Sequence, residues 1–265
     1  EERYSETARI TSPTPWDIIN ELMQGGLGAG ELGVVVAPAG IGKTWVLSAM
    51  GAYAISKGLN VVHYTLELNE AYVGLRYDSI FSGVEGQNLK YHKEEVMEKL
   101  FKLDGNLTIK YYPTKACTVN TLSAHLKKVT TFGTKVDMVL VDYADIMKDV
   151  NKHTEMRHAL GSIYEDLRGL AGEMQIPIWT ASQANRSALD EDVIEASKVA
   201  ESYAKVMTAD FVLSLSRKIE DKIGNTGRFH VIKNRFGPDG LTYPAKINTN
   251  IGKIEIFESN SIQGK

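Results

Sequence analysis

The stretch GVVVAPAGIGKTW, Gly33 to Trp45, decides the fold, because it nearly matches a phosphate-binding loop. The P-loop pattern is G-x-x-x-x-G-K-[ST], in which a glycine-rich backbone cradles phosphates and the lysine reaches the β- and γ-phosphates. Counting back from Gly42, Lys43 and Thr44, Ala37 occupies the place of the first glycine. An alanine is tolerable at the exit of a strand if its φ is negative, so this departure does not exclude nucleotide binding.

The segments on either side of the loop have the periodicities that a P-loop requires. Residues 32–36 form an apolar, β-branched run typical of a buried parallel strand. Residues 45–57 carry apolar residues at helical spacing and stop at Gly58, which is a typical helix end. The alternative, a glycine-rich turn with a surface lysine, does not explain why strand, loop and helix follow one another in this order.

A helix N-terminus that follows such a loop is an anion-binding site. We predict that ATP or ADP contacts the loop, that the Lys43 ammonium lies on the phosphates, and that the Thr44 hydroxyl binds Mg²⁺. The predicted nucleotide-binding residues are Ala39, Gly40, Ile41, Gly42, Lys43, Thr44 and Trp45.

Composition limits the class of protein. The chain has 265 residues, of which 43% are hydrophobic and 24% charged, as in ordinary soluble domains. The apolar runs are too short to span a membrane, so no membrane association is expected. Cys117 is the only cysteine, which fits a reducing, cytoplasmic setting. A net charge of −3 argues against a globally basic nucleic-acid binder but leaves room for a locally basic loop.

Strand-like and helix-like segments alternate along most of the chain. This alternation predicts an α/β fold with a mostly parallel, twisted sheet flanked by helices. The alternating stretch TYPAKINTN-IGKIEIFE predicts a C-terminal β-hairpin that turns at residues 250–253. Residues 1–15 are polar and contain two prolines, so we interpret them as a linker or arm, and residues 16–265 as one ATPase domain. The chain begins with Glu1 instead of Met, as a piece of a longer chain would.

Asp142 is a candidate metal ligand, because it ends the most hydrophobic strand-like run, residues 138–141. An aspartate at the end of such a strand holds Mg²⁺ in P-loop ATPases, as the Walker B residue. Two alternatives remain open: Asp142 could cap a turn, or Asp145 could take the metal role instead.

Glu67 and Gln183 also follow predicted strands. Open parallel sheets place their chemistry at the carboxyl ends of strands, so both residues are expected near the γ-phosphate. A glutamate there can orient or deprotonate the attacking water, and a neutral amide can contact the γ-phosphate and report hydrolysis. The alternatives are a glutamate that favours a helix N-terminus and an ordinary surface glutamine.

Five motifs together carry a resemblance to a known family. APAGIGKT, YTLELNEAYVGLR, MVLVDYADIM, IPIWTASQANRSAL and VIKNRFGPDG occur in the order and spacing of the RecA-like motor domain of DnaB-type replicative helicases, particularly those of phages. That family commonly has alanine at the first P-loop position. The resemblance covers roughly residues 12–258.

The resemblance implies a role for each matching residue. Lys43 and Thr44 would be the Walker A pair, Glu67 the catalytic glutamate, Asp142 the Walker B aspartate and Gln183 the coupling glutamine. Lys233 and Arg235 match the lysine and arginine finger that act on a neighbour's ATP. They follow a predicted strand, residues 228–232, and the alternative is a basic strand end that pairs with surface carboxylates such as Asp239.

The resemblance also implies self-association into a homohexamer around single-stranded DNA, with a primase and a helicase loader as partners of the full-length protein. Two loops are expected to contact DNA phosphates, one after the Walker B strand and one after Gln183. For each cation, a solvated charged loop is the alternative. The predicted DNA-binding residues are Lys148, Lys152, His153, Arg157, Arg186 and Lys198.

Two features separate the chain from a complete member of that family. The resemblance implies an N-terminal domain that these 265 residues do not contain, and we expect the chain to open in what would be the linker. The motif KNRFG also resembles RadA-type recombination ATPases, although no zinc-binding cysteines are present. The alternatives are therefore a RadA-, RecA- or KaiC-like ATPase without processive unwinding, and a ring-forming nucleotide-binding module that depends on the missing part.

Overall fold

The computed structural model describes residues 9–199 and 203–258. Its centre is a nine-stranded sheet in the order β11-β10-β9-β8-β3-β7-β6-β4-β5. The strands of this sheet are β3 (Leu32–Ala37), β4 (Val61–Thr65), β5 (Leu107–Tyr111), β6 (Met138–Asp142), β7 (Ile178–Gln183), β8 (Phe211–Ser216), β9 (Thr226–Asn234), β10 (Thr242–Asn248) and β11 (Lys253–Ile256).

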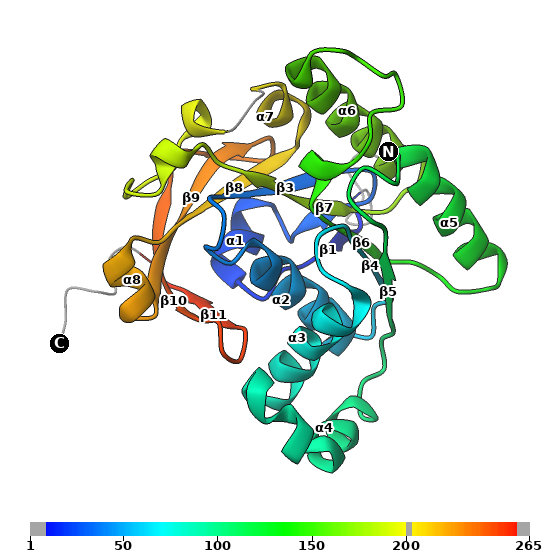
Figure 1. Ribbon diagram of the computed structural model, residues 1–265, viewed down its shortest axis with the longest axis vertical. Coiled ribbons are helices and arrows are strands. Elements are labelled where there is room, and N and C mark those ends of the chain that lie inside the picture. Colours follow the sequence, from blue (N-terminus) through cyan, green and yellow to red (C-terminus); the bar gives the residue numbers. More distant parts are fainter. Residues whose placement is uncertain (1–8, 200–202, 259–265) are drawn as a thin grey trace.

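Helices cover both faces of this sheet (Figure 1). The α-helices are α1 (Asp17–Leu22), α2 (Lys43–Ser56), α3 (Glu70–Ser82), α4 (Lys93–Leu100), α5 (Val119–Thr131), α6 (Met156–Met174), α7 (Ala204–Thr208) and α8 (Ile219–Ile223). None of the helices within the described ranges is long and apolar enough to cross a membrane.

Alternate side chains of the central strand β3 enter two separate cores. Leu32, Val34 and Val36 pack with residues of α5 and α6 on one face. Val35 and Ala37 pack with residues of α1, α2 and α3 on the other. Successive side chains of a strand point to opposite faces, so a continuous apolar run is what a strand covered on both sides requires.

The sheet is parallel from β8 to β5 and antiparallel beyond β8. Strand β3 pairs in parallel with β7 and β8, and β4 pairs in parallel with β5 and β6. Strand β9 pairs antiparallel with β8 and β10, and β10 and β11 form the C-terminal hairpin. The predicted mostly parallel α/β sheet and its C-terminal hairpin are therefore confirmed.

The strand before the cation pair is longer than the predicted range 228–232. It begins at Thr226, where β10 pairs with it, and continues through Asn234, where β8 pairs with it. The register against β8 shifts between Val212 and Leu213. Lys233 consequently belongs to the strand, and Arg235 follows directly after it.

The described part of the expected linker packs on the domain. Thr11 and Ser12 form a short strand, β1 (Thr11–Ser12), that pairs with β2 (Leu27–Gly28). The Arg9 guanidinium lies 2.7 Å from the Glu31 carboxylate, and Thr14 is fully buried. Residues 1–8 lie outside the described residues, and the division at residue 15 stays a prediction.

Candidate active site

The P-loop connects the carboxyl end of β3 to the first residue of α2, Lys43. Gly40 and Gly42 have φ angles of +72° and +123°, a backbone conformation that residues other than glycine rarely adopt. Ala37 does not have a positive φ angle. The alanine is therefore compatible with the loop, as expected. The backbone N–H groups of Gly40, Ile41 and Gly42 donate to no described residue, so they are available to an anion.

The Lys43 ammonium lies inside this loop. It donates hydrogen bonds to the carbonyl oxygens of Ala37, at 3.1 Å, and Pro38, at 3.2 Å. Burial lowers the pKa of Lys43, and the negative charges of Asp142 and Glu67 oppose that shift. A cation held by two neutral carbonyls and close to carboxylates can exchange those carbonyls for phosphate oxygens.

The other predicted groups lie on the strands that follow β3 across the sheet, in the order β7, β6 and β4. Gln183 is the register partner of Ala37, and Asp142 that of Thr65. The N–H of Leu66 donates to the carbonyl oxygen of Asp142 at 2.8 Å, which places Glu67 next to the end of β6. The sheet thus brings Glu67, Asp142 and Gln183 to the edge that carries the P-loop.

Asp142 fits the role of a Mg²⁺ ligand. Both of its carboxylate oxygens are buried, and neither has a hydrogen-bond partner within the described residues. Burial raises the pKa of Asp142, while the nearby Thr44 hydroxyl and the Arg76 and Lys43 cations favour its ionised form. A buried carboxylate without a partner is costly unless a ligand satisfies it, and Mg²⁺ commonly takes one or two carboxylates together with phosphates and waters.

The competing aspartate, Asp145, is already satisfied. Its Oδ1 accepts from the Tyr164 hydroxyl at 2.8 Å and lies 2.9 Å from the Lys205 ammonium. Its Oδ2 accepts the backbone N–H of Gln183 at 2.9 Å. The geometry therefore favours Asp142 over Asp145 as the metal ligand.

A pocket of about 370 Å³ opens above the loop. Glu67 lies exposed at this pocket, where its carboxylate can meet solvent. The residues that line the pocket are Gly40, Ile41, Gly42, Lys43, Thr44, Trp45, Glu67, Leu68, Arg76, Arg217, Lys222 and Thr249. Among the predicted nucleotide-binding residues, Gly40 to Trp45 line it, and Ala39 lies exposed directly before them.

Arg76 is the main residue that the sequence prediction missed. Its guanidinium lies 4.9 Å from the centre of the Trp45 ring, a cation–π geometry. Burial lowers the pKa of Arg76, and Asp142 and Glu67 raise it. Its position in the helix after Glu67, at the end of the motif YTLELNEAYVGLR, was the available signal. Arg217, Lys222 and Thr249 reach the pocket from distant parts of the chain, without a local signal.

Lys233 and Arg235 lie at the opposite edge of the sheet. Because β9 runs antiparallel to β8, its last residue Asn234 is the register partner of Phe211, the first residue of β8. Leu32 and Ala37 mark the two ends of β3, about 16 Å apart at about 3.3 Å per residue. The length of strand β3 therefore separates Lys233 and Arg235 from the P-loop of the same chain.

Both cations have partners within the chain. The Lys233 ammonium donates to the carbonyl oxygens of Val206 and Met207, at the end of α7. The Arg235 guanidinium lies 2.7 Å from Asp210, a different carboxylate from the Asp239 considered above. The register of β8 and β9 places Asp210 beside Arg235, a neighbour that sequence spacing does not reveal.

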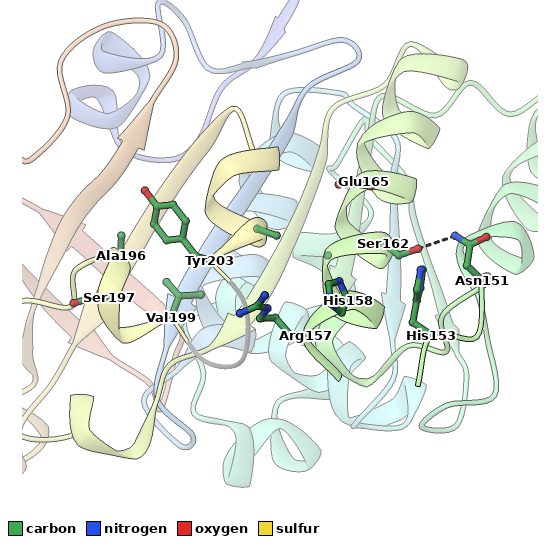
Figure 2. A pocket seen from close by; sticks show the side chains of 12 residues that line it. Asn151, His153, Arg157, His158, Ser162, Glu165, Ala196, Ser197, Val199 and Tyr203 are labelled. Atoms are coloured by element: carbon green, nitrogen blue, oxygen red, sulfur yellow. Dashed lines mark hydrogen bonds between the residues drawn. The ribbon is translucent and has the colours of Figure 1, made fainter. Parts of the chain in front are cut away.

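A groove of about 830 Å³ lies between the start of α6 and residues 196–199 (Figure 2). Among the predicted DNA-binding residues, His153 and Arg157 line it, and Ser197 beside Lys198 lines its other side. Figure 2 shows Arg157 between His158 and Val199. The structure thus brings the two predicted DNA-binding loops to one groove.

The remaining predicted DNA-binding cations lie outside the lining of this groove. Lys148, Lys152 and Arg186 are exposed. The Lys198 ammonium lies 2.7 Å from the Glu191 carboxylate. His153, in the groove lining, donates from Nδ1 to the Asp149 carboxylate at 2.8 Å.

Known proteins resemble this chain in both sequence and fold. A family model described as the DnaB-like helicase C terminal domain matches residues 13–251. A DnaB-like replicative helicase of Enterobacteria phage T4 is 28% identical over 246 residues, which cover 88% of this chain and 52% of that protein. A replicative DNA helicase DnaB of Helicobacter pylori is 26% identical over 200 residues, 72% of this chain and 41% of that protein. The chain spans about half the length of these relatives or less.

Solved structures share the fold at low sequence identity. The ATPase domain of G40P superposes on this chain with a TM-score of 0.81 at 17% identity, and the superposition covers 94% of this chain and 92% of the G40P domain. The RadB recombinase superposes with a lower TM-score, 0.62, at 19% identity, over 94% of this chain and 100% of that one. The match of the family model over most of the sequence, on a chain that keeps the P-loop and its facing carboxylates, shows that this protein belongs to the DnaB-like helicase C-terminal domain family.

Proposed function

We propose that the chain is the ATP-hydrolysing motor of a DnaB-type replicative helicase, which assembles into a homohexameric ring and translocates on single-stranded DNA in the cytoplasm. The observation that carries the proposal is the separation of two halves of an active site. Lys43, Glu67 and Asp142 lie at the carboxyl edge of the sheet, whereas Lys233 and Arg235 lie at the amino edge.

The carboxyl edge supplies the nucleotide-binding half. The loop N–H groups and Lys43 would bind the phosphates of ATP, and Thr44 and Asp142 would hold Mg²⁺, whose charge offsets that of the phosphates. Glu67 is the candidate base for the attacking water, and Gln183, on the strand next to the P-loop strand, is the candidate reporter of the γ-phosphate.

The amino edge supplies the half that acts on a neighbour. An arginine finger stabilises charge that develops on the transferred phosphoryl group, and it can be provided by another subunit. Arg235 cannot serve its own P-loop across the sheet, so a ring in which each subunit faces the next would give both halves a partner. The groove that gathers His153 and Arg157 would then bind the DNA backbone. One solved relative concerns a DnaB-like replicative helicase and its interactions with primase; primase and loader contacts would belong to the full-length protein.

The proposal is tested by measuring ATP turnover with and without single-stranded DNA, together with the mass of the assembly in the presence of ATP. Turnover stimulated by DNA, in an assembly of several subunits, is the expected result. A monomer with DNA-independent turnover would contradict it. Strand displacement on a forked substrate separates a helicase from a RadA-like remodelling ATPase.

A further inference from the structure

Asp210 joins two arginines at the amino edge of the sheet. Its side chain is only 1% exposed, and its Oδ1 lies 2.7 Å from Arg235 Nη1 and 3.0 Å from Arg168 Nη2. Its Oδ2 accepts from Arg168 Nε at 3.1 Å and from the backbone N–H of Leu32 at 2.9 Å. One buried carboxylate thus fixes α6, β3 and the residue that follows β9.

The backbone reinforces this arrangement. The N–H of Arg235 donates to the carbonyl oxygen of Asp210 at 3.0 Å, so the main chain and the side chain of Arg235 are both tied to the same residue. A guanidinium that is held at one nitrogen and at its own backbone has few rotamers left. Arginine loses less freedom per hydrogen bond than lysine because its donors form a rigid plane.

The remaining donors of Arg235 are available to a ligand. Its side chain is 48% exposed, and within the described residues its Nε and Nη2 atoms make no hydrogen bond. The Lys233 ammonium lies nearby: burial lowers the pKa of Lys233, and Arg235 and Arg168 lower it further, while Asp210 raises it. Three cations around one carboxylate leave a surplus of positive charge, which suits a phosphate group.

We propose that Asp210 is a positioning residue for Arg235: it orients the guanidinium so that its free donors point away from the subunit, toward a nucleotide bound by a neighbour. The proposal rests on the proposed function, because it requires Arg235 to act on another subunit's ATP. Asp210 itself touches no nucleotide. Its contribution is pre-organisation, since misplacing a reacting group by about 1 Å can cost on the order of 10²-fold in rate.

The test is Asp210→Asn, which keeps the size of the side chain and removes its charge. We expect turnover of the assembled protein to fall on the order of 10²-fold, with the affinity for a fluorescent ATP analogue unchanged. Mixing this variant with Lys43→Ala protein should restore activity, because a Lys43→Ala subunit still offers an intact finger to an intact P-loop.

Asp137→Asn is the matched control. Asp137 also lies at the amino edge, is 11% exposed, accepts a backbone N–H from Asn60 at 2.9 Å and pairs with Lys135 at 2.6 Å. It contacts neither Arg168 nor Arg235, so its removal should leave turnover unchanged. If Asp210→Asn protein does not fold, Arg168→Gln is the fallback variant, because it removes the other arginine that pairs with Asp210. We then expect turnover to fall on the order of tenfold, and mixing with Lys43→Ala protein to restore it.

Wild-type or higher turnover of Asp210→Asn protein would overturn the proposal. A loss of turnover that co-assembled Lys43→Ala protein does not rescue would also overturn it. Such a loss would indicate a general structural defect, which damages both the P-loop and the finger of the same subunit. The mixture of Arg235→Ala with Lys43→Ala separates this failure from that of the proposed function. If that mixture is active and the Asp210→Asn mixture is not, only the role of Asp210 is wrong. If neither is active, the finger acting on a neighbour is wrong as well.

Discussion

The buried ammonium of Lys205 lies 2.9 Å from Asp145, whose other oxygen accepts the backbone N–H of Gln183. Lys205 belongs to α7, and its side chain is only 1% exposed. The Ser182 hydroxyl lies 3.2 Å from the same ammonium. This ion pair therefore ties α7 to the strand end that carries the candidate γ-phosphate reporter.

Replacing Lys205 by methionine should destabilise the protein by about 3 kcal/mol, because the loss of one partner leaves a buried charge without compensation. The hydrogen bonds of Asp145 to Tyr164 and Gln183 remain, so the cost should lie at the lower end for buried pairs. Denaturant unfolding followed by circular dichroism measures the change.

Lys127→Met is the control for this prediction. Lys127 lies 2.7 Å from Glu173, but both side chains are more than half exposed, so its loss should cost less than about 1 kcal/mol. Adding Asp145→Asn to Lys205→Met should recover part of the loss, because no buried charge then remains. Equal effects of the Lys205 and Lys127 substitutions would show that the buried pair is not a stability determinant.

Glu67→Gln should bind ATP with nearly unchanged affinity and hydrolyse it very slowly. The substitution keeps the shape of the side chain and removes the carboxylate that would accept a proton from water. Equilibrium binding of a fluorescent ATP analogue and the rate of phosphate release measure the two properties separately. Lys43→Ala, in contrast, should lose both phosphate binding and turnover.

Asp145→Asn provides the comparison for the base assignment. Asp145 is engaged with Tyr164, Lys205 and Gln183, so its substitution should act through stability and through the position of Gln183. If Asp145→Asn alone blocks hydrolysis in a folded protein while Glu67→Gln is nearly normal, Glu67 is not the base.

Much of the nucleotide site could be predicted because its signals are local. The strand, the glycine-rich loop and the helix follow one another in the sequence, and a parallel sheet necessarily collects the carboxyl ends of its strands at one edge. Glu67, Asp142 and Gln183 could therefore be placed together without knowledge of the strand order.

The parts that could not be predicted depend on pairing between distant segments. Asp210, instead of Asp239, accompanies Arg235 because β8 and β9 are antiparallel and in a particular register. Arg217 reaches the pocket from the end of β8, and Thr249 reaches it from the end of β10, in the antiparallel part of the sheet. A single sequence shows the residues on both segments but not the register that joins them.

Removing cations from the two predicted DNA-binding loops should weaken the binding of single-stranded DNA and reduce its dependence on salt. Each phosphate contact with a single strand contributes about 0.7 to the slope of log K against log salt concentration, so replacing Lys152, Arg157 and Arg186 by glutamine should lower the slope by about 2. Fluorescence anisotropy of a labelled oligonucleotide over a salt series measures this slope.

The control for the groove removes the same number of exposed cations elsewhere. Lys102, Lys127 and Lys135 have side chains that are 70%, 58% and 81% exposed, and none belongs to either predicted DNA-binding loop. Replacing them by glutamine should change the slope little. Unchanged affinity of the groove variant at low salt would refute the assignment of these loops to DNA.

Arg235→Ala should bind nucleotide normally and lose turnover by on the order of 10³-fold or more, as expected for a finger that stabilises charge in the transition state. The binding half of each subunit is untouched, because Arg235 lies at the other edge of the sheet. Arg228→Ala, which removes another arginine of β9 that pairs with Asp221 at 2.9 Å, should retain turnover.

A mixture of Arg235→Ala and Lys43→Ala proteins then distinguishes a finger in trans from a residue that acts within its own subunit. Mixed rings contain interfaces in which an intact P-loop meets an intact finger, so the mixture should be active although each component alone is not. Native mass spectrometry shows whether the two proteins co-assemble. If they do and turnover is still absent, Arg235 does not act on a neighbour's ATP, and its pairing with Asp210 is structural.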